Sequence, residues 1–177
     1  RRVVGKIIRI AEQHKWHTIS LQLPPSSWFG VDDIQLAQQT AEITKIAVYV
    51  FDKYISDYER KSHVKELVIA FDKHDKKAIE QGIEQGKHVA YAVNLARHWI
   101  DLPPVALHPE EMATIARGIA QENNLTITVF NEKQIIEMGM GGLAAVSRGS
   151  DIDAQFVILE YDCGNKNAPT LGFVGKG

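Results

Sequence analysis

The sequence contains one cysteine, Cys163, among its 177 residues. A single thiol cannot form an internal disulfide, and it cannot supply the set of cysteines that a structural zinc site of that type needs. We therefore expect no disulfide framework. Because such frameworks belong to oxidising compartments, a cytoplasmic protein is the natural expectation.

Long apolar runs and an excess of positive charge are also missing. No stretch approaches the roughly 18 consecutive apolar residues of a membrane-spanning helix, so we expect no membrane association. The first residues, RRVVGKIIRIAEQHKWHT, have neither the apolar run nor the cleavage site of a secretory signal. The formal net charge of -2 provides no basic field, so nucleic-acid binding is not expected.

Several familiar catalytic motifs are absent from the sequence, namely HExxH, GxSxG, GxGxxG and GxxxxGKS/T. The seven histidines show no metal-ligand spacing, and His14 and His17 lie three residues apart without a third ligand nearby. Ser147 and Ser150 flank an Arg-Gly pair, which is a weak signal for a phosphate-binding loop. Cys163 follows a predicted strand without a partner histidine, so it is interpreted as a bystander thiol.

What the chain does contain is an alternation of helical and strand-like periodicity, typical of an α/β fold. Asp32 or Asp33 is a candidate helix N-cap, as is Asn131. The run 67–71 is apolar at every position, which predicts a strand covered on both faces. Gly82 and Gly86 are expected to weaken the long helix that contains them. Helices are predicted over 3–13, 34 to about 54, 77–102, 108–124 and 131–140, and strands over 17–24, 64–72, 125–130, 154–161 and 170–177.

The segment TLGFVGKG at 170–177 is predicted to be a buried strand that ends in a lysine between two glycines. Lys176 has a plain interpretation as a surface lysine in a turn. Position favours a second interpretation, because ligands gather at the carboxyl ends of strands in open α/β sheets. Flanking glycines would also let the backbone approach a bound group closely. Spacing alone does not decide between the two.

Three segments in succession resemble the leucyl aminopeptidase (cytosol aminopeptidase) family of two-metal exopeptidases. They are AVNLARHWIDLPP with LHPEEMA after it, EKQIIEMGMGGLAAVSRGS, and FVILEY followed by LGFVGKG. The resemblance covers Val93 to Gly177 strongly, and the first 75 residues less distinctively. Residues 101–106 and Arg148 depart from the family's usual pattern, so local contacts and substrate preference are left open.

The resemblance implies a fold in three parts. Residues 1–76 would be the latter part of a macro-like N-terminal α/β domain, and 77–102 would be a connector helix. Residues 103–177 would be the first part of an α/β zinc-exopeptidase-like catalytic domain. On this interpretation the chain is cut at both ends, and most of the active site lies beyond Gly177.

The resemblance also implies a chemistry, the release of N-terminal amino acids of the leucine type from peptides by two divalent metal ions. The ions would be manganese or zinc, with magnesium as a further candidate. Lys176 matches the family's lysine that ligates one metal; an amine ligates only when neutral, and an adjacent dication favours that form. No other catalytic or metal residue is expected within residues 1–177, so these residues alone are predicted to be inactive. The intact chain is expected to form a homo-hexamer.

Two alternatives remain open at this point. The first is a non-catalytic binding or regulatory module derived from the same family, either macro-like or associated with DNA. The near-neutral charge argues against a strong role on DNA. The second is a naturally short family member that acts as a regulator or subunit partner.

Overall fold

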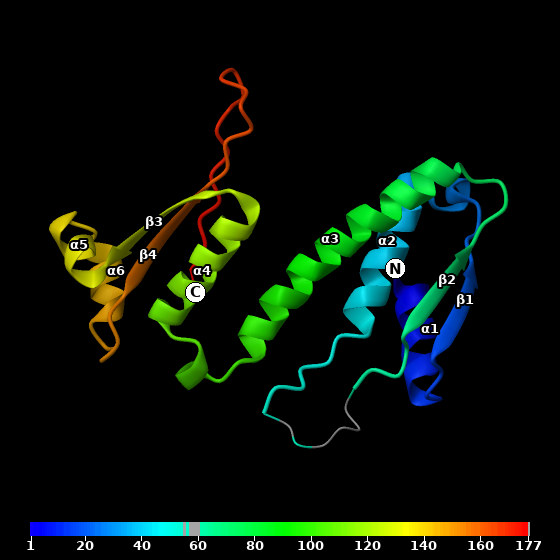
Figure 1. The fold of residues 1–177 in the computed structure, drawn as a ribbon, viewed down its shortest axis with the longest axis horizontal. Helices are drawn as coiled ribbons and strands as arrows, with labels where there is room; N and C mark the ends of the chain where they lie inside the picture. The colour runs from blue at the N-terminus through cyan, green and yellow to red at the C-terminus, as the bar shows by residue number, and fades with distance from the viewer. Residues whose placement is uncertain (55, 57–60, 177) are drawn as a thin grey trace. The chain divides into compact units, whose positions relative to one another are not determined.

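The computed structural model describes residues 1–54, 56 and 61–176 and divides the chain into two units, Arg1–Asp101 and Leu102–Gly177 (Figure 1). Each unit combines helices with a two-stranded sheet, which confirms the expected α/β class. The predicted division at residues 76 and 102 into a macro-like domain, a connector helix and a catalytic domain stays a prediction. No helix among the described residues is long and apolar enough to cross a membrane.

The sheet of the first unit is a parallel pair, β1 (Thr18–Gln22) and β2 (Glu66–Ala70). One face is covered by helices, because Ile19 and Leu67 pack with α1 (Arg2–Gln13) and Ile69 packs beside the next two helices. The opposite face is open, and Val68 on it is 44% exposed. The expectation of a strand covered on both faces is therefore wrong, since the helices of this unit pack on the Leu67 face.

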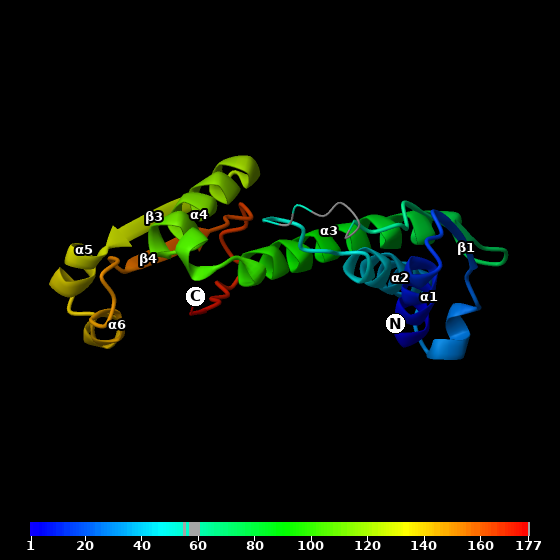
Figure 2. The same ribbon diagram turned by 90° about the horizontal axis from the view of Figure 1, so that it is seen from below.

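Helices α2 (Asp33–Ala47) and α3 (Lys76–Asp101) lie side by side in the same direction (Figures 1 and 2). A Cβ added to Gly82 would lie 2.8 Å from Ala37 Cβ and still closer to the carbonyl oxygen of Ile34. Gly86 makes the equivalent approach one turn later, where an added Cβ would lie 2.9 Å from Ala41 Cβ. These two glycines, expected to weaken α3, instead permit the close contact between the helices.

Helix α2 ends at Ala47, whereas its apolar stripe predicted a helix to about Tyr54. The carbonyls of its last turn are capped from α3. Asn94 Nδ2 donates to the Lys45 carbonyl at 3.1 Å, and Arg97 Nη1 donates to the Ile46 carbonyl at 2.9 Å. Contacts with α3, rather than the local sequence, thus set the end of α2.

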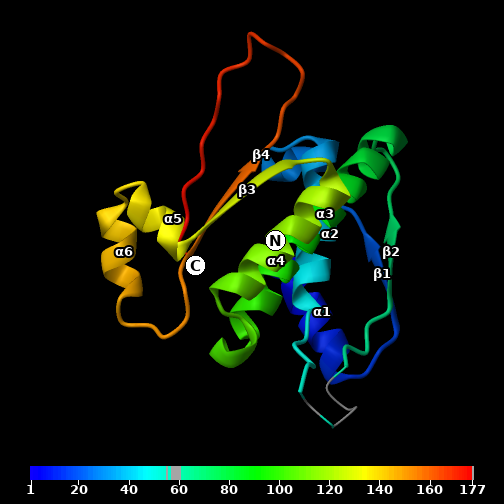
Figure 3. The same cartoon turned by 60° about the vertical axis from the view of Figure 1, so that its left-hand side comes forward.

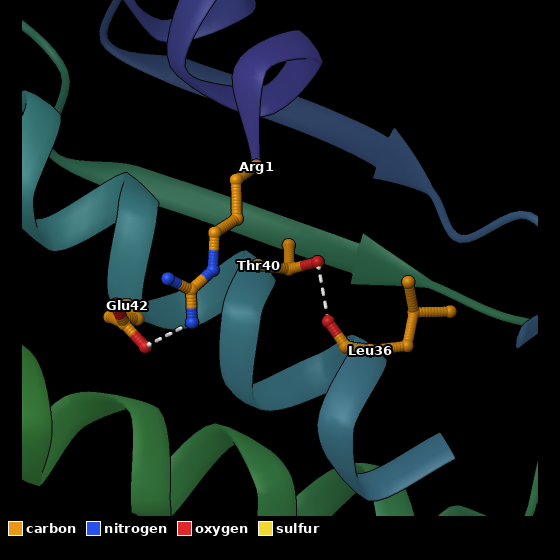
Figure 4. Close-up of polar contacts among 4 residues, drawn as sticks. All are labelled: Arg1, Leu36, Thr40 and Glu42. Carbon is orange, nitrogen blue, oxygen red and sulfur yellow. Dashed lines mark hydrogen bonds and ion pairs between the residues drawn. The ribbon is translucent and has the colours of Figure 1, made fainter. Parts of the chain in front are cut away.

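Two polar side chains are buried on α2, and both have partners (Figure 4). Thr40 is 3% exposed, and its hydroxyl donates to the Leu36 carbonyl at 2.8 Å. Glu42 is 8% exposed, and its carboxylate lies 3.5 Å from the Arg1 guanidinium. Satisfied polar groups of this kind avoid the free-energy cost of burying an unpaired donor or charge.

The sheet of the second unit is an antiparallel pair, β3 (Thr126–Asn131) and β4 (Gln155–Glu160), and α4 (Pro109–Asn123) packs against both strands. Phe130 and Phe156 are paired across the strands with ring centroids 6.0 Å apart. Two short helices, α5 (Glu132–Glu137) and α6 (Gly141–Ser147), connect the strands. Single 3-10 turns, η1 (Ser26–Phe29) and η3 (Pro104–Ala106), complete the assigned elements.

The helix boundaries confirm most of the capping predictions. Asp32 accepts a hydrogen bond from Gln35 N at 2.7 Å and is the N-cap of α2. Asn131 forms a reciprocal capping box with Gln134 at the start of α5. The glycine-rich segment after α5 was not predicted as a helix, yet residues 141–147 form α6.

Candidate functional site

Lys176 lies in the segment 161–176, where the structure has turns but neither helix nor strand (Figure 3). Its side chain is exposed, and so are those of Leu171, Phe173 and Val174, at 76%, 90% and 102%. The predicted buried strand over 170–177 is therefore wrong as far as Lys176, and Gly177 lies outside the described residues. The physical reason is pairing, because a strand needs a hydrogen-bonded neighbour and the described residues offer these none.

Within this segment, the hydrogen bonds of residues 162–167 are local. Gly164 N donates to Asp162 Oδ1 at 2.8 Å, and Asn167 N donates to Asn165 Oδ1 at 3.1 Å. Such side-chain to backbone hydrogen bonds satisfy backbone N–H groups of the loop, but they do not fix the direction of the chain that follows it. Cys163 is exposed within the same loop, in line with its interpretation as a bystander.

The donor set around Lys176 can be compared with what metal ions require. Across residues 1–54, 56 and 61–176, no group of three or more histidine, cysteine or acidic side chains could hold a metal ion. One lysine nitrogen cannot by itself bind two divalent ions, each of which takes four or more ligands. The described residues therefore do not fit a complete two-metal site, and the metal role of Lys176 stays a prediction.

The histidines singled out by sequence have separate structural roles. The His14 ring stacks on Trp16 with centroids 5.1 Å apart, and His17 Nδ1 lies 3.2 Å from the His63 carbonyl. The His98 ring lies 5.4 Å from the Phe51 ring. None of these contacts brings two histidines together as metal ligands.

Ser147 and Ser150, on either side of Arg148, also form hydrogen bonds with nearby backbone groups. Ser147 Oγ donates to the Ala144 carbonyl at 3.1 Å, and Ser150 Oγ accepts from Ile152 N at 3.0 Å. The Ser-Arg-Gly-Ser stretch is thus the end of α6 and a turn. No contact in it supports the weak phosphate-loop interpretation.

Sequence reasoning missed a carboxylate that joins two distant segments. Glu12, at the end of α1, accepts hydrogen bonds from His63 N and Val64 N, both at 2.9 Å, and from the Ser62 hydroxyl. Burial raises the pKa of Glu12, but these three hydrogen bonds outweigh it, so the pKa lies below its ordinary value. No local pattern signals this contact, because its partners lie about 50 residues away.

A cavity at the end of β1 and β2 was also missed. It is formed by residues 22–28 with Asp33 and residues 72–74. Only the general rule that ligands bind at the carboxyl ends of parallel strands could have pointed to it. Of the two cap candidates Asp32 and Asp33, Asp32 is the cap, and Asp33 accepts a hydrogen bond from Asp75 N at 2.9 Å.

Comparison with known proteins gives a consistent set of relatives. Residues 94–177 match the family model described as the cytosol aminopeptidase family, catalytic domain. The cytosol aminopeptidase of Pseudomonas aeruginosa is 34% identical over 149 residues, covering 84% of this chain and 30% of that protein. A probable cytosol aminopeptidase of Alkaliphilus metalliredigens is 29% identical over all of this chain, which covers 36% of its own length. The chain spans about a third of the length of these curated relatives.

Two solved structures show the same fold. The bottromycin maturation enzyme BotP, in complex with Mn, superposes with a TM-score of 0.72 at 26% identity, over 90% of this chain and 32% of that chain. A tomato leucine aminopeptidase variant superposes with a TM-score of 0.76 at 21% identity, over 88% of this chain and 31% of that chain. The second likeness is one of fold alone.

Proposed function

The chain belongs to the cytosol aminopeptidase family, and we propose that the whole protein releases N-terminal amino acids from peptides by metal-dependent hydrolysis. The observation that carries this proposal is the match of residues 94–177 to the family's catalytic domain. That match includes Lys176 and the segment before it. Peptides with a free N-terminus are the proposed substrates, and leucine is the N-terminal residue that the protein is proposed to release.

Divalent metal ions are the proposed cofactors, two per active site, with manganese or zinc favoured over magnesium. Support comes from family membership and from the BotP relative, which was solved with Mn. A bound divalent ion supplies Lewis-acid chemistry to a peptide hydrolase. From the described residues we propose one contribution only, the Lys176 amine as a ligand, because no cluster of three or more histidine, cysteine or acidic side chains among them could hold a metal ion.

The test is an assay of the whole protein on leucine p-nitroanilide and on the dipeptide Leu-Gly. We expect hydrolysis that stops after chelation with EDTA and returns when manganese is added. N-acetyl-Leu-Gly serves as the matched control and should not be cleaved, because it lacks the free amino group. Absence of hydrolysis by the metal-loaded whole protein would contradict the proposal and favour a non-catalytic module.

Three further parts of the proposal concern the chain alone, its assembly and its location. Residues 1–177 assayed in parallel should be inactive, since the described residues contain no complete metal site. The whole protein should elute as a homo-hexamer in light-scattering chromatography, and it should fractionate with the cytoplasm. A monomer at micromolar concentration would contradict the proposed assembly without affecting the proposed chemistry.

A further inference from the structure

A cavity of about 640 Å³ lies in the first unit, where β1 and β2 end. Its volume falls within the range of roughly 300–1,000 Å³ that ligand pockets occupy. The carboxyl ends of parallel strands are also where α/β proteins bind small molecules. The lining residues are Gln22, Leu23, Pro24, Pro25, Ser26, Ser27, Trp28, Asp33, Asp72, Lys73 and His74.

Hydrogen bonds tie the two walls of this cavity together. His74 Nε2 lies 3.0 Å from the Pro24 carbonyl, and because a carbonyl only accepts, the ring nitrogen is the donor. Asp75 N donates to Asp33 Oδ2 at 2.9 Å. The pKa of Asp33 lies below its ordinary value, because its carboxylate accepts hydrogen bonds from Ser26 and from Asp75 N. The walls are thus held in place without a ligand, and preformed sites bind at a lower entropic cost.

One side of the cavity is apolar. Leu23, which is 3% exposed, lines the cavity together with Pro24 and Pro25. Trp28 is 74% exposed, so most of an aromatic side chain in the wall is available to a ligand. An apolar group against this side would remove that surface from water.

The charged side chains of the cavity carry both signs. Asp72 and Lys73 are adjacent in the loop between β2 and α3, and both are exposed. The carboxylate can accept from an ammonium group, and the lysine can donate to a carboxylate. A ligand that carries one charge of each sign close together, on an apolar body, satisfies both residues.

A phosphate ligand is a poorer match for this cavity. The N-termini of α2 and α3 lie beside it, and such termini commonly bind anions. Here a carboxylate of the chain already accepts a hydrogen bond at each of these helix N-termini. At α2, Asp32 accepts from Gln35 N, and at α3, Asp75 Oδ1 accepts from Lys77 N at 2.9 Å. With Asp33 and Asp72 both in the wall, a polyanion would meet two carboxylates and one lysine.

We propose that this cavity binds a free α-amino acid with an apolar side chain. Its ammonium group pairs with Asp72, its carboxylate pairs with Lys73, and its side chain covers Trp28 and the Pro24–Pro25 edge. The inference uses only the cavity and its lining. It therefore goes beyond the proposed function and stands whether or not the protein is a peptidase.

The experiment is a titration of the whole protein with L-leucine, followed by tryptophan fluorescence. Trp28 is isolated by subtracting the signal of a Trp28→Phe variant, and Trp16→Phe is the matched control that should keep the response. We expect a saturable change with a Kd of about 1 mM, and weakening of about five- to tenfold in Asp72→Asn and Lys73→Met. Asp151→Asn and Lys166→Met, which change exposed residues of the second unit, should titrate as the unchanged protein does.

Two analogues test the assignment of the charges. Leucinol lacks the carboxylate and has no bond that a peptidase could hydrolyse, and 4-methylpentanoate lacks the amine, so each should bind more weakly than leucine. The inference is overturned if leucine gives no saturable Trp28 signal up to about 50 mM, far above the expected Kd. It is equally overturned if both analogues bind as tightly as leucine, or if Asp72→Asn and Lys73→Met leave the titration unchanged while keeping a native circular dichroism spectrum.

Discussion

The two units differ in how far apart in the sequence the partners of their side-chain hydrogen bonds lie. In the first, side-chain hydrogen bonds join segments 42 to 52 residues apart, as between Glu12 and Val64 or Asn94 and Lys45. In the second, the side-chain hydrogen bonds of the described residues mostly join positions two to four residues apart. Its longest link joins Glu132 to Ala154 N across 22 residues.

The same contrast holds for packing. In the first unit, Gly82 and Gly86 let the backbones of α2 and α3 come close together. Both units bury isoleucine completely, so the contrast lies in this helix contact and not in the presence of a core. In the second unit, Gly118 on α4 has open space where a Cβ would lie. We infer that the first unit depends on tertiary contacts and the second largely on secondary structure. Substitutions matched across the two units test this inference.

The largest effect is expected from glycine substitutions in the long helices. Gly82→Ala should lower the free energy of unfolding by about 1–3 kcal/mol, because the added methyl meets the α2 backbone and overpacking outweighs the gain in helix propensity. Gly118→Ala should raise it by about 0.5–1 kcal/mol, since only the propensity gain applies.

Urea unfolding followed by amide hydrogen exchange resolves both units, whereas all three tryptophans, Trp16, Trp28 and Trp99, lie in the first unit. If Gly82→Ala and Gly118→Ala changed the free energy of unfolding in the same direction, the inferred difference between the two units would be contradicted.

An intermediate effect is expected at Glu12. Glu12→Gln replaces a charged acceptor of three hydrogen bonds and should cost about 1–2 kcal/mol, whereas Glu132→Gln alters one and should cost about 0.5–1 kcal/mol. Because the pKa of Glu12 is lowered on folding, its contribution is present above the ordinary value of 4.5 and is lost as the pH falls through the lowered value.

The unfolding free energy of the unchanged protein should therefore decline below about pH 4.5 more steeply than that of Glu12→Gln. Chemical unfolding at pH 3 to 7 measures both curves. Parallel curves would show that the carboxylate does not join α1 to the segment before β2.

The smallest effect is expected at Arg97. Its guanidinium donates to Ile46 and to Asn94 and lies 4.2 Å from the Tyr49 ring centroid. Arg97→Lys keeps the charge but loses the planar group, and should cost about 1 kcal/mol. Arg117→Lys, at an exposed position on α4, should change stability by less than about 0.5 kcal/mol. Equal effects in thermal unfolding would contradict a capping role for Arg97.

Local signals in the sequence predicted local features of the fold. Asp32 and Asn131 were identified as caps because a side chain that accepts from a backbone N–H three residues on is a short-range pattern. The strands 18–22 and 126–131 followed from their alternation. These features depend on neighbours that can be seen in any short stretch of the sequence.

Features that depend on distant partners were missed or predicted wrongly. The apolar stripe predicted α2 to about Tyr54, but side chains of α3 cap it at Ala47. Gly82 and Gly86 have a GxxxG spacing that could have indicated close helix packing, yet local propensity alone suggested weakness. The exposed segment 170–176 shows the same dependence, because apolar alternation makes a strand only where another strand is available to pair with it.

For the site itself, the sequence identified the family through the segments from Val93 onward, and the comparisons support that identification. The role of Lys176 came from the resemblance and stays a prediction. No local pattern in the sequence indicated the cavity between residues 22–28 and 72–74, because its two walls are separated in sequence by α2.

The central claim, that this is a metal-dependent aminopeptidase with Lys176 as a ligand, is tested most directly by metal content. The whole protein would be loaded with manganese, dialysed and measured by mass spectrometry, beside Lys176→Met and the matched control Lys166→Met. We predict two ions per chain for the unchanged protein and for Lys166→Met, and about one fewer for Lys176→Met, because a thioether cannot replace an amine for a hard ion. Equal metal content in all three proteins would contradict the claim.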